Sequence, residues 1–297
     1  KFEMITCAIT GSNGVLGKKL KRKLPYRFYE FKKDIRDVKS VEDWVLKKDF
    51  DIVIHLAAVV TVDEVNKSYK KAYDINVNGT LNLINSILKK KNKPKWFFFA
   101  STSHVYKPTL KLRIINEKNI TNPQNKYGKT KLIAEKLIKN LLKNNSIKFC
   151  IGRIFSFTDS KQKSPYVIPN IIKKIKSKNK IITFKNLNNF RDFLNIKDIV
   201  LAIDTLRKNK AFGVYNIGSG ISFDLRKIAT IFSKKYNKKI NFQSLSKPSF
   251  LISNNKKIKK LGWKEEPKGV SKVMSVCMLI VISTVFLPLS ITQTKIA

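Results

Sequence analysis

The chain has 297 residues, of which 43% are hydrophobic and 27% charged. This composition excludes general disorder and supplies enough apolar material for a full-sized enzyme core. The 11 glycines and 9 prolines exclude a fibrous or low-complexity protein. Because Cys7, Cys150 and Cys277 lie far apart, we expect neither a disulfide framework nor a metal site, and we expect a reducing, cytoplasmic compartment.

The net charge of +41 would suit a phosphate-rich partner. The excess is carried by 53 lysines and only 8 arginines spread over the whole chain, whereas proteins that read DNA grooves concentrate arginine on one element. Solvated helix faces explain runs such as KKLKRK and KKIKSKNK better than a nucleic-acid site does. We therefore expect no specific nucleic-acid partner, and a lysine-rich nucleic-acid binder is the minor alternative.

The first 155 residues alternate between apolar strands and helices. The run at 4–9 ends in TGSNG, as a buried parallel strand before a glycine turn does, and a helix is predicted over 15–24. Further strands are predicted at 26–31, 51–58, 96–101 and 147–155, and further helices at 41–48, 74–91 and 127–142. Repeated units of this kind predict a doubly wound α/β fold with a parallel sheet.

The pattern loosens after residue 157. A helix to about 178, a short strand at 181–184, the segment RDFLNIKDIV and a strand at 213–219 are typical of a small substrate lobe added to such a sheet. We assign 1–157 and 186–217 to a dinucleotide-binding domain. We assign 158–185 and 218–269 to the substrate lobe.

Residues 270–297 form an apolar C-terminal tail. Val273 to Ile291 contains 19 residues without a charge, directly after a lysine-rich region. A helix of this length nearly crosses a hydrocarbon core. Three interpretations stay open: a membrane anchor, a packed segment of the lobe, or an aberrant tail. The chain starts at Lys1 with no apolar leader, so secretion is not expected.

The segment TGSNGVLG follows the first strand and opens a helix, which is the context that a dinucleotide fingerprint requires. Gly11, Gly14 and Gly17 would let backbone N–H groups approach a pyrophosphate at the helix N-terminus. Lys32 and Lys33 follow the second strand and favour NADP, but the general abundance of lysine explains them equally well. The choice between NAD and NADP stays open.

Tyr127 and Lys131 are four residues apart in YGKTK, so a helix projects both from one face. An ammonium group beside a phenol lowers its pKa, and the same ammonium can bind a nicotinamide ribose. Thr102, at the end of the WFFFAST strand, can offer a hydroxyl to the same substrate oxygen. Together with the glycine turn, this order of motifs predicts an oxidoreductase-type site.

These motifs resemble the extended short-chain dehydrogenase/reductase family, in particular the NAD-dependent epimerase/dehydratase branch that acts on nucleotide sugars. The resemblance covers residues 4–263 and rests on motifs in the family's order: TGSNGVLG, DIRD, HLAA, NVNGT, ASTSHVY, YGKTK, RIFS, RDFLNIKDIV, GVYNIGSG and LGW. It implies a Rossmann domain that binds NAD, with NADP as the alternative, a nucleotide-sugar substrate and a homodimer.

The resemblance also assigns roles to residues. Thr102, Tyr127 and Lys131 would be catalytic. The cofactor would be bound by Gly11, Asn13, Gly14, Val15, Leu16, Gly17, Asp34, Ile35, Leu56, Ala57, Ala58, Asn76, Tyr127 and Lys131. The substrate would be bound by Thr102, Ser103, Tyr166, Ile168, Pro169 and Arg191, with Arg191 on the diphosphate. A surface ion pair is the alternative interpretation of Arg191.

One departure narrows the chemistry. Nucleotide-sugar 4,6-dehydratases carry an acidic pair directly after the catalytic threonine, where this chain has Ser103 and His104. Without an acid and a base for elimination, we expect a 4-epimerase, with a 4-ketoreductase similar to dTDP-4-dehydrorhamnose reductase, or a non-catalytic dinucleotide-binding scaffold, as alternatives. His104 is interpreted as structural or as a proton relay, and His55 as structural.

Overall fold

The computed structural model describes residues 4–244 and 246–265, and its centre is a parallel β-sheet. Six strands pair in the order β11-β6-β4-β3-β1-β2. Their bounds are β1 Thr6–Thr10, β2 Arg27–Phe31, β3 Ile52–His55, β4 Trp96–Thr102, β6 Lys148–Ile154 and β11 Gly213–Ile217. The predicted doubly wound α/β class is confirmed.

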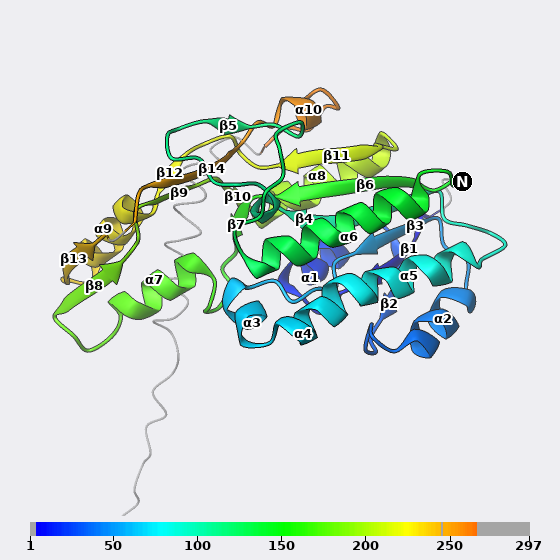
Figure 1. Cartoon of the computed structure of the whole chain (residues 1–297), viewed down its shortest axis with the longest axis horizontal. Coiled ribbons are helices and arrows are strands. Elements are labelled where there is room, and N and C mark those ends of the chain that lie inside the picture. Colours follow the sequence, from blue (N-terminus) through cyan, green and yellow to red (C-terminus); the bar gives the residue numbers. More distant parts are fainter. Residues whose placement is uncertain (1–3, 245, 266–297) are drawn as a thin grey trace, which may run out of the picture.

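Helices cover both faces of this sheet, as Figure 1 shows. One layer consists of α1 (Val15–Lys23) and α8 (Ile196–Lys208), and the other of α2 (Val38–Leu46), α5 (Gly79–Leu88) and α6 (Lys126–Leu142). Side chains of β1 alternate between the layers, with Cys7 and Ile9 in one apolar core and Ala8 in the other. Burial on both faces explains why the strands read as continuous apolar runs.

The predicted helix over 74–91 is interrupted at its start. A π-helical segment, η1 (Asp74–Asn78), precedes α5, and two short helices, α3 (Val62–Lys67) and α4 (Tyr69–Tyr73), lead into it. A 3₁₀ turn, η2 (Ser103–Val105), follows β4. The π turn contains the buried Asn76, whose side chain is hydrogen-bonded to the loop after β3. Such segments are frequent at functional sites.

The small lobe lies beyond the carboxyl end of β6, at the left of Figure 1. It packs α7 (Val167–Ile175) and α9 (Leu225–Lys235) on the parallel pair β8 (Ile181–Lys185) and β13 (Lys239–Gln243). Ile172 and Phe232 lie in its apolar core. The lobe therefore has its own core, separate from the two that flank the main sheet.

Two small sheets join the lobe to the main domain. One has the order β12-β9-β14-β5 and the other pairs β10 with β7. Their bounds are β5 Ile114–Ile115, β7 Ser156–Thr158, β9 Asn189–Arg191, β10 Phe193–Asn195, β12 Phe223–Asp224 and β14 Ser249–Ser253. Between β9 and β10, the buried carboxylate of Asp192 accepts hydrogen bonds from Ser219, Gly220 and Ser253. A single side chain thus ties three segments together.

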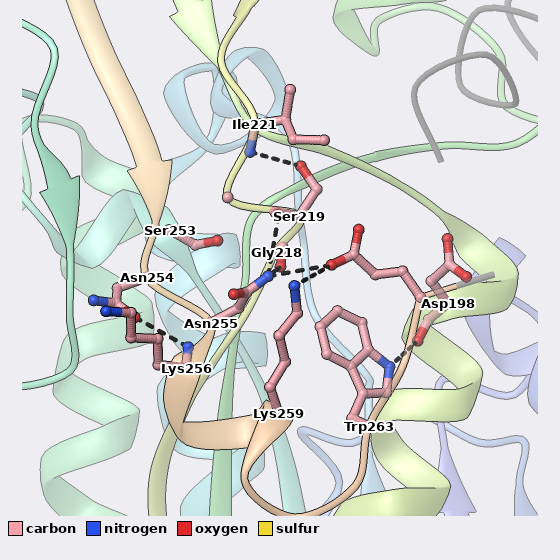
Figure 2. Close-up of polar contacts among 12 residues, drawn as sticks. Asp198, Gly218, Ser219, Ile221, Ser253, Asn254, Asn255, Lys256, Lys259 and Trp263 are labelled. Atoms are coloured by element: carbon pink, nitrogen blue, oxygen red, sulfur yellow. Dashed lines mark hydrogen bonds and ion pairs between the residues drawn. The ribbon is translucent and has the colours of Figure 1, made fainter. Parts of the chain in front are cut away.

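The last described element, α10 (Lys256–Lys259), is fastened to the main domain (Figure 2). The Asn255 side-chain amide donates to the carbonyl oxygens of Gly218 and Ser219 at 2.9 and 3.0 Å. Lys259, the last residue of α10, forms an ion pair of 3.0 Å with Glu265.

Ile258 and Trp263 lie in the core of the main sheet, and Trp263 Nε1 donates to the Asp198 carbonyl oxygen at 3.1 Å. This stretch falls in the predicted lobe, but its apolar side chains Ile258 and Trp263 pack on the main domain. Residues 270–297, to which the tail interpretations apply, lie outside the described residues. No helix within residues 4–244 and 246–265 is long and apolar enough to cross a membrane.

Candidate functional site

The glycine turn lies between β1 and α1. Gly11 has φ +70°, which favours glycine, and its carbonyl accepts the N–H of Gly14 at 3.1 Å. A Cβ at Gly17 would lie 2.6 Å from the Gly11 carbonyl oxygen, so the helix packs directly against the turn. This close packing leaves the α1 N-terminus facing the end of the sheet, as in an anion-binding turn.

A cavity of about 510 Å³ opens beside this turn. It lies at the carboxyl ends of β1, β3 and β4, where the strand order reverses and where ligands bind in doubly wound folds. The predicted site residues that line it are Gly11, Gly14, Val15, Leu16, Gly17, Leu56, Ala57, Ala58, Thr102, Ser103, Tyr127, Lys131, Tyr166 and Ile168. These residues come from five segments of the chain, which therefore meet in one place.

Six predicted residues do not line this cavity: Asn13, Asp34, Ile35, Asn76, Pro169 and Arg191. Asp34 lies at a separate surface hollow of about 420 Å³, where it pairs with Arg36 at 2.6 Å. Ile35 is buried among core side chains. A Cβ at Gly79 would lie 2.6 Å from the Ile35 side chain, so Ile35 packs closely against the start of α5.

The Asn76 side chain joins two segments next to the cavity. Its Oδ1 accepts the Val59 N–H at 2.8 Å, and its Nδ2 donates to the Val59 carbonyl and to Thr130 Oγ1, both at 3.0 Å. It thus joins the loop after β3 to α6. Asn76 therefore fixes the backbone at Val59, between the lining residues Ala58 and Val60.

His55 is enclosed between hydroxyl groups. Its Nδ1 lies 2.6 Å from Thr10 Oγ1, and its Nε2 lies 2.9 Å from Thr80 Oγ1. Burial, together with the charge of Lys131, lowers the pKa of His55 to about 3. The ring is therefore neutral at pH 7, and both of its nitrogens have partners.

Thr102, Tyr127 and Lys131 come together at one side of the cavity. Thr102 is the last residue of β4, and Tyr127 and Lys131 lie on the first turns of α6. The helix starts there because the Asn125 side chain caps it, accepting the Gly128 N–H at 2.8 Å. The Thr102 hydroxyl lies close enough to that of Tyr127 to affect its pKa, and the Lys131 ammonium lies 3.9 Å from the centre of the Phe99 ring.

Burial governs the charges of this trio. It raises the pKa of Tyr127 above its usual range, against a lowering effect of the Thr102 hydrogen bond. It lowers the pKa of Lys131 to about 7, against the opposing effect of Glu135. Burial thus favours the uncharged form of both side chains: Tyr127 is a phenol at pH 7, and Lys131 is a mixture of amine and ammonium. Shifts of this size are typical of catalytic groups, but the pKa of Tyr127 is raised, whereas the sequence predicted that Lys131 would lower it.

A buried charge network lies directly behind the trio. Arg153 binds Glu135 through Nε at 3.0 Å and through Nη2 at 2.7 Å, and donates to the Tyr106 hydroxyl at 2.7 Å. Ser101, beside Thr102, donates to Glu135 at 2.5 Å. The sequence analysis missed this network, although Glu135 follows Lys131 by one helical turn and could have been noticed from that spacing.

Arg191 is mostly shielded and contacts only neutral acceptors. Its guanidinium donates to the carbonyl oxygens of Phe190 and Ser249, both at 2.9 Å, and to Ser249 Oγ and Asn189 Oδ1. Burial lowers the pKa of Arg191 to about 10. No carboxylate of the described residues forms an ion pair with Arg191. The alternative interpretation of Arg191 as a surface ion-pair residue is therefore not supported within residues 4–244 and 246–265.

The cavity also contains residues that the sequence analysis did not assign. Ser156, Gln162 and Phe193 line it at the lobe side. Gln162 is 4% exposed, and its Nε2 has no hydrogen-bond partner among the described residues. Its position in an irregular loop after β7 gave no signal in the sequence.

Short-chain dehydrogenases have this arrangement: polar and apolar side chains line a cavity that extends from a glycine turn to a helix with a tyrosine and a lysine. The family model described as GDP-mannose 4,6 dehydratase matches residues 10–271. The chain belongs to the extended short-chain dehydrogenase/reductase family, in the NAD-dependent epimerase/dehydratase branch, as the sequence analysis predicted.

Similar curated proteins include enzymes of several activities. A dTDP-D-glucose 4,6-dehydratase of Dictyostelium discoideum is 34% identical over 209 residues, which cover 67% of this chain and 47% of that protein. A UDP-glucose 4-epimerase of Mycoplasma genitalium is 29% identical over 267 residues, 81% of this chain and 78% of that protein. The match thus spans about half the length of the dehydratase and most of the epimerase.

Solved structures share the fold. RMD from Pseudomonas aeruginosa, complexed with NADPH, has a TM-score of 0.83 and 22% identity, and the match covers 95% of this chain and all of that one. A UDP-glucose 4-epimerase from Thermotoga maritima, with UDP-glucose, has a TM-score of 0.81 and 19% identity, with 95% and 100% covered. At this identity the likeness establishes the fold.

Proposed function

We propose that this protein is an NAD(P)-dependent enzyme that acts at C4 of a nucleotide sugar, with Tyr127 as acid and base. A 4-epimerase is the preferred activity. The observation that carries the proposal is that Thr102, Tyr127 and the buried Lys131 line one cavity together with the glycine turn.

The residues of the glycine turn suit a dinucleotide. The absence of side chains at Gly11 and Gly17 lets the turn and α1 pack closely, and the α1 N-terminus then favours a pyrophosphate. A nicotinamide dinucleotide held there would accept hydride from a sugar carbinol and return it to a ketone. Lys32 and Lys33 are exposed after β2, and their presence keeps NADP open beside NAD.

Each catalytic residue has a separate task. Tyr127 takes the proton of the C4 hydroxyl and later returns one. Thr102 donates a hydrogen bond to the same oxygen. Lys131 lies one turn along the helix, where its ammonium form would oppose the effect of burial on Tyr127 and favour the phenolate.

Arg191 provides the proposed contact for the diphosphate of the substrate. It is a mostly shielded cation whose described partners are neutral, so a phosphate would supply its missing counter-charge. Arg191 does not line the catalytic cavity, although its charge reaches His104, which does. Tyr166, Ile168 and the unpartnered Gln162 line that cavity from the lobe side and would contact the sugar.

Two alternatives stay in view. A 4-ketoreductase would use the same trio once per turnover and exchange its cofactor. The absence of a carboxylate at Ser103 and His104 disfavours a dehydratase, because elimination needs an acid and a base. A non-catalytic scaffold would have no use for the buried trio.

The first test is Tyr127→Phe in the full chain. We expect turnover of UDP-galactose with NAD, or of a dTDP-4-keto-6-deoxy sugar with NADPH, to fall by about 10²–10⁴-fold, because the acid and base is removed. Dinucleotide binding, followed by fluorescence titration, should stay within threefold of wild type. Retained turnover would contradict the assignment of Tyr127, and absence of dinucleotide binding in the wild type would refute both enzyme proposals.

The bound nucleotide separates the two enzyme activities. Acid release followed by chromatography should yield about one NAD per chain from a 4-epimerase, which regenerates its cofactor in each cycle. A site that is purified empty and binds NADPH more tightly than NADH indicates the reductase and gives Lys32 and Lys33 a role.

We also propose a homodimer through the two helices over 74–91 and 127–142. Light scattering on the full chain tests it. A monomer at micromolar concentration would contradict it.

A further inference from the structure

The imidazole of His104 lies beside the catalytic tyrosine and lines the cavity. It belongs to the turn η2, directly after Ser103, and its ring is 5.8 Å from the Tyr127 ring, measured between centroids. The two rings meet edge-on, at an angle of 63°. The position of the proton on this imidazole therefore matters for any ligand that reaches Tyr127.

Asn125 decides which ring nitrogen carries that proton. Its Oδ1 accepts the Gly128 N–H at 2.8 Å, which fixes the orientation of the amide. Its Nδ2 then faces Nδ1 of His104 at 2.9 Å. Because an amide nitrogen can only donate, Nδ1 of His104 must be the acceptor and must lack a proton.

The ring is also neutral. Burial, with a further contribution from the charge of Arg191, lowers the pKa of His104 to about 4. A neutral imidazole without a proton on Nδ1 carries it on Nε2. No hydrogen bond from Nε2 to another part of the described chain is present, in contrast to His55, whose two nitrogens are both engaged.

The backbone of His104 is held as firmly as its ring. A Cβ at Gly128 would lie 2.2 Å from the His104 carbonyl oxygen, so the first turn of α6 rests directly on it. The same helix start supplies Asn125, its N-cap residue. The packing of α6 on η2 thus fixes both the place and the tautomer of His104.

We propose that His104 is a specificity-determining residue that donates a hydrogen bond from Nε2–H to a sugar oxygen other than the one at C4. The inference rests on the proposed function, since it concerns the same cavity. It requires a substrate with an acceptor oxygen, hydroxyl or carbonyl, close to the reacting carbon. In this tautomer Nε2 carries the proton and has no lone pair free to accept another, while the lone pair of Nδ1 accepts from Asn125, so His104 does not act as the base that an elimination would need.

The proton position is measured directly, without any substrate. The chain has two histidines, so the full-length protein labelled with ¹⁵N-histidine gives two ring systems, and His104→Gln assigns them. At pH 7 we expect the His104 spectrum to show a protonated Nε2 and an unprotonated Nδ1. A proton on Nδ1, or on both nitrogens, would overturn the proposal.

Asn125→Ser is the matched variant. Serine still caps α6 by accepting the Gly128 N–H, but it has no amide to donate to Nδ1. We expect the two tautomers of His104 to mix while the circular dichroism and the melting temperature change little. An unchanged tautomer would show that the Asn125 amide does not fix the proton on Nε2 of His104.

Two substitutions test the donor in turnover. His104→Phe keeps a flat ring without a donor, and we expect kcat/KM for the nucleotide sugar to fall about 10- to 100-fold. His104→Gln restores an N–H donor and should recover most of the loss. Equal kcat/KM for His104→Phe and the wild type would refute the role. Failure of the full chain to act on any nucleotide sugar refutes the proposed function and with it the role of His104 in binding sugar, while the labelled spectrum still decides the tautomer.

Discussion

Arg153 and Arg191 are both shielded from water, but they differ in what neutralises them. Burial disfavours the positive charge of Arg153, but Glu135 and Tyr106 outweigh that effect and hold the pKa of its guanidinium above the usual range. Arg191 has only carbonyl, amide and hydroxyl oxygens around it, and burial lowers its pKa. The difference indicates that Arg153 serves the fold, whereas Arg191 is suited to an anionic ligand.

The largest expected effect is on Arg153. Arg153→Leu leaves Glu135, which is fully buried, without its cation, and we expect the free energy of unfolding to fall by about 3–5 kcal/mol. For a domain of this size that lowers the melting temperature on the order of 10 °C. Differential scanning calorimetry measures it.

The double variant Arg153→Leu/Glu135→Leu is the control. It removes both charges, so it should be more stable than Arg153→Leu alone. A double variant as unstable as the sum of the single variants would show that packing volume, and not the unpaired charge, causes the loss.

The second effect tests Arg191. Arg191→Met should weaken binding of the tightest of UDP, GDP and dTDP, measured by calorimetry, about 10- to 100-fold, because a charge-assisted contact to the diphosphate is lost. Its melting temperature should change much less than that of Arg153→Leu, since no buried carboxylate is left behind. If Arg191→Met unfolds as readily as Arg153→Leu and binds nucleotide normally, the two arginines do not differ in the way described.

Local patterns in the sequence account for what was predicted of this site. The glycine turn, the strand that ends at Thr102 and the YGKTK helix are each defined by neighbouring residues, and their meeting follows from the parallel order of the sheet. The strands of the main sheet were predictable as well, because strands buried on both faces read as apolar runs.

Long-range pairing accounts for what was missed. Arg191 is held by Ser249, which is 58 residues away, and Asn216 reaches the carbonyl of Ile115 over 101 residues. Nothing in the local pattern of either segment indicates its partner. The same holds for the return of α10 to the main core, because a four-residue helix has no periodicity to show which face is buried.

The third effect concerns Lys131, which is buried. Glu135 acts on Lys131 only through its charge, whereas it forms an ion pair with Arg153. The pKa of Lys131 is lowered from 10.5 to about 7, so between these values the unfolded chain binds more protons than the folded one. Stability from this group therefore rises with pH above 7, by at most about 1.4 kcal/mol per pH unit. Urea unfolding at pH 7, 8 and 9 should show this rise in the wild type relative to Lys131→Met. Parallel curves for the two proteins would mean that Lys131 keeps an ordinary pKa.

The smallest effect is expected at the edge of the Arg153 network. Ser101→Ala removes the hydrogen bond to Glu135 but leaves Arg153 in place, so we expect a loss of about 1 kcal/mol. Ser86→Ala is a matched control. Ser86 is equally buried but donates only to the Asn82 carbonyl of its own helix, so its replacement by alanine should cost little stability.

Because Ser101 precedes Thr102 on β4, a network that also positions the trio predicts a lower kcat for Ser101→Ala with KM unchanged. Loss of stability with an unaltered kcat would show that the Arg153 network stabilises the fold but does not position Thr102, Tyr127 and Lys131.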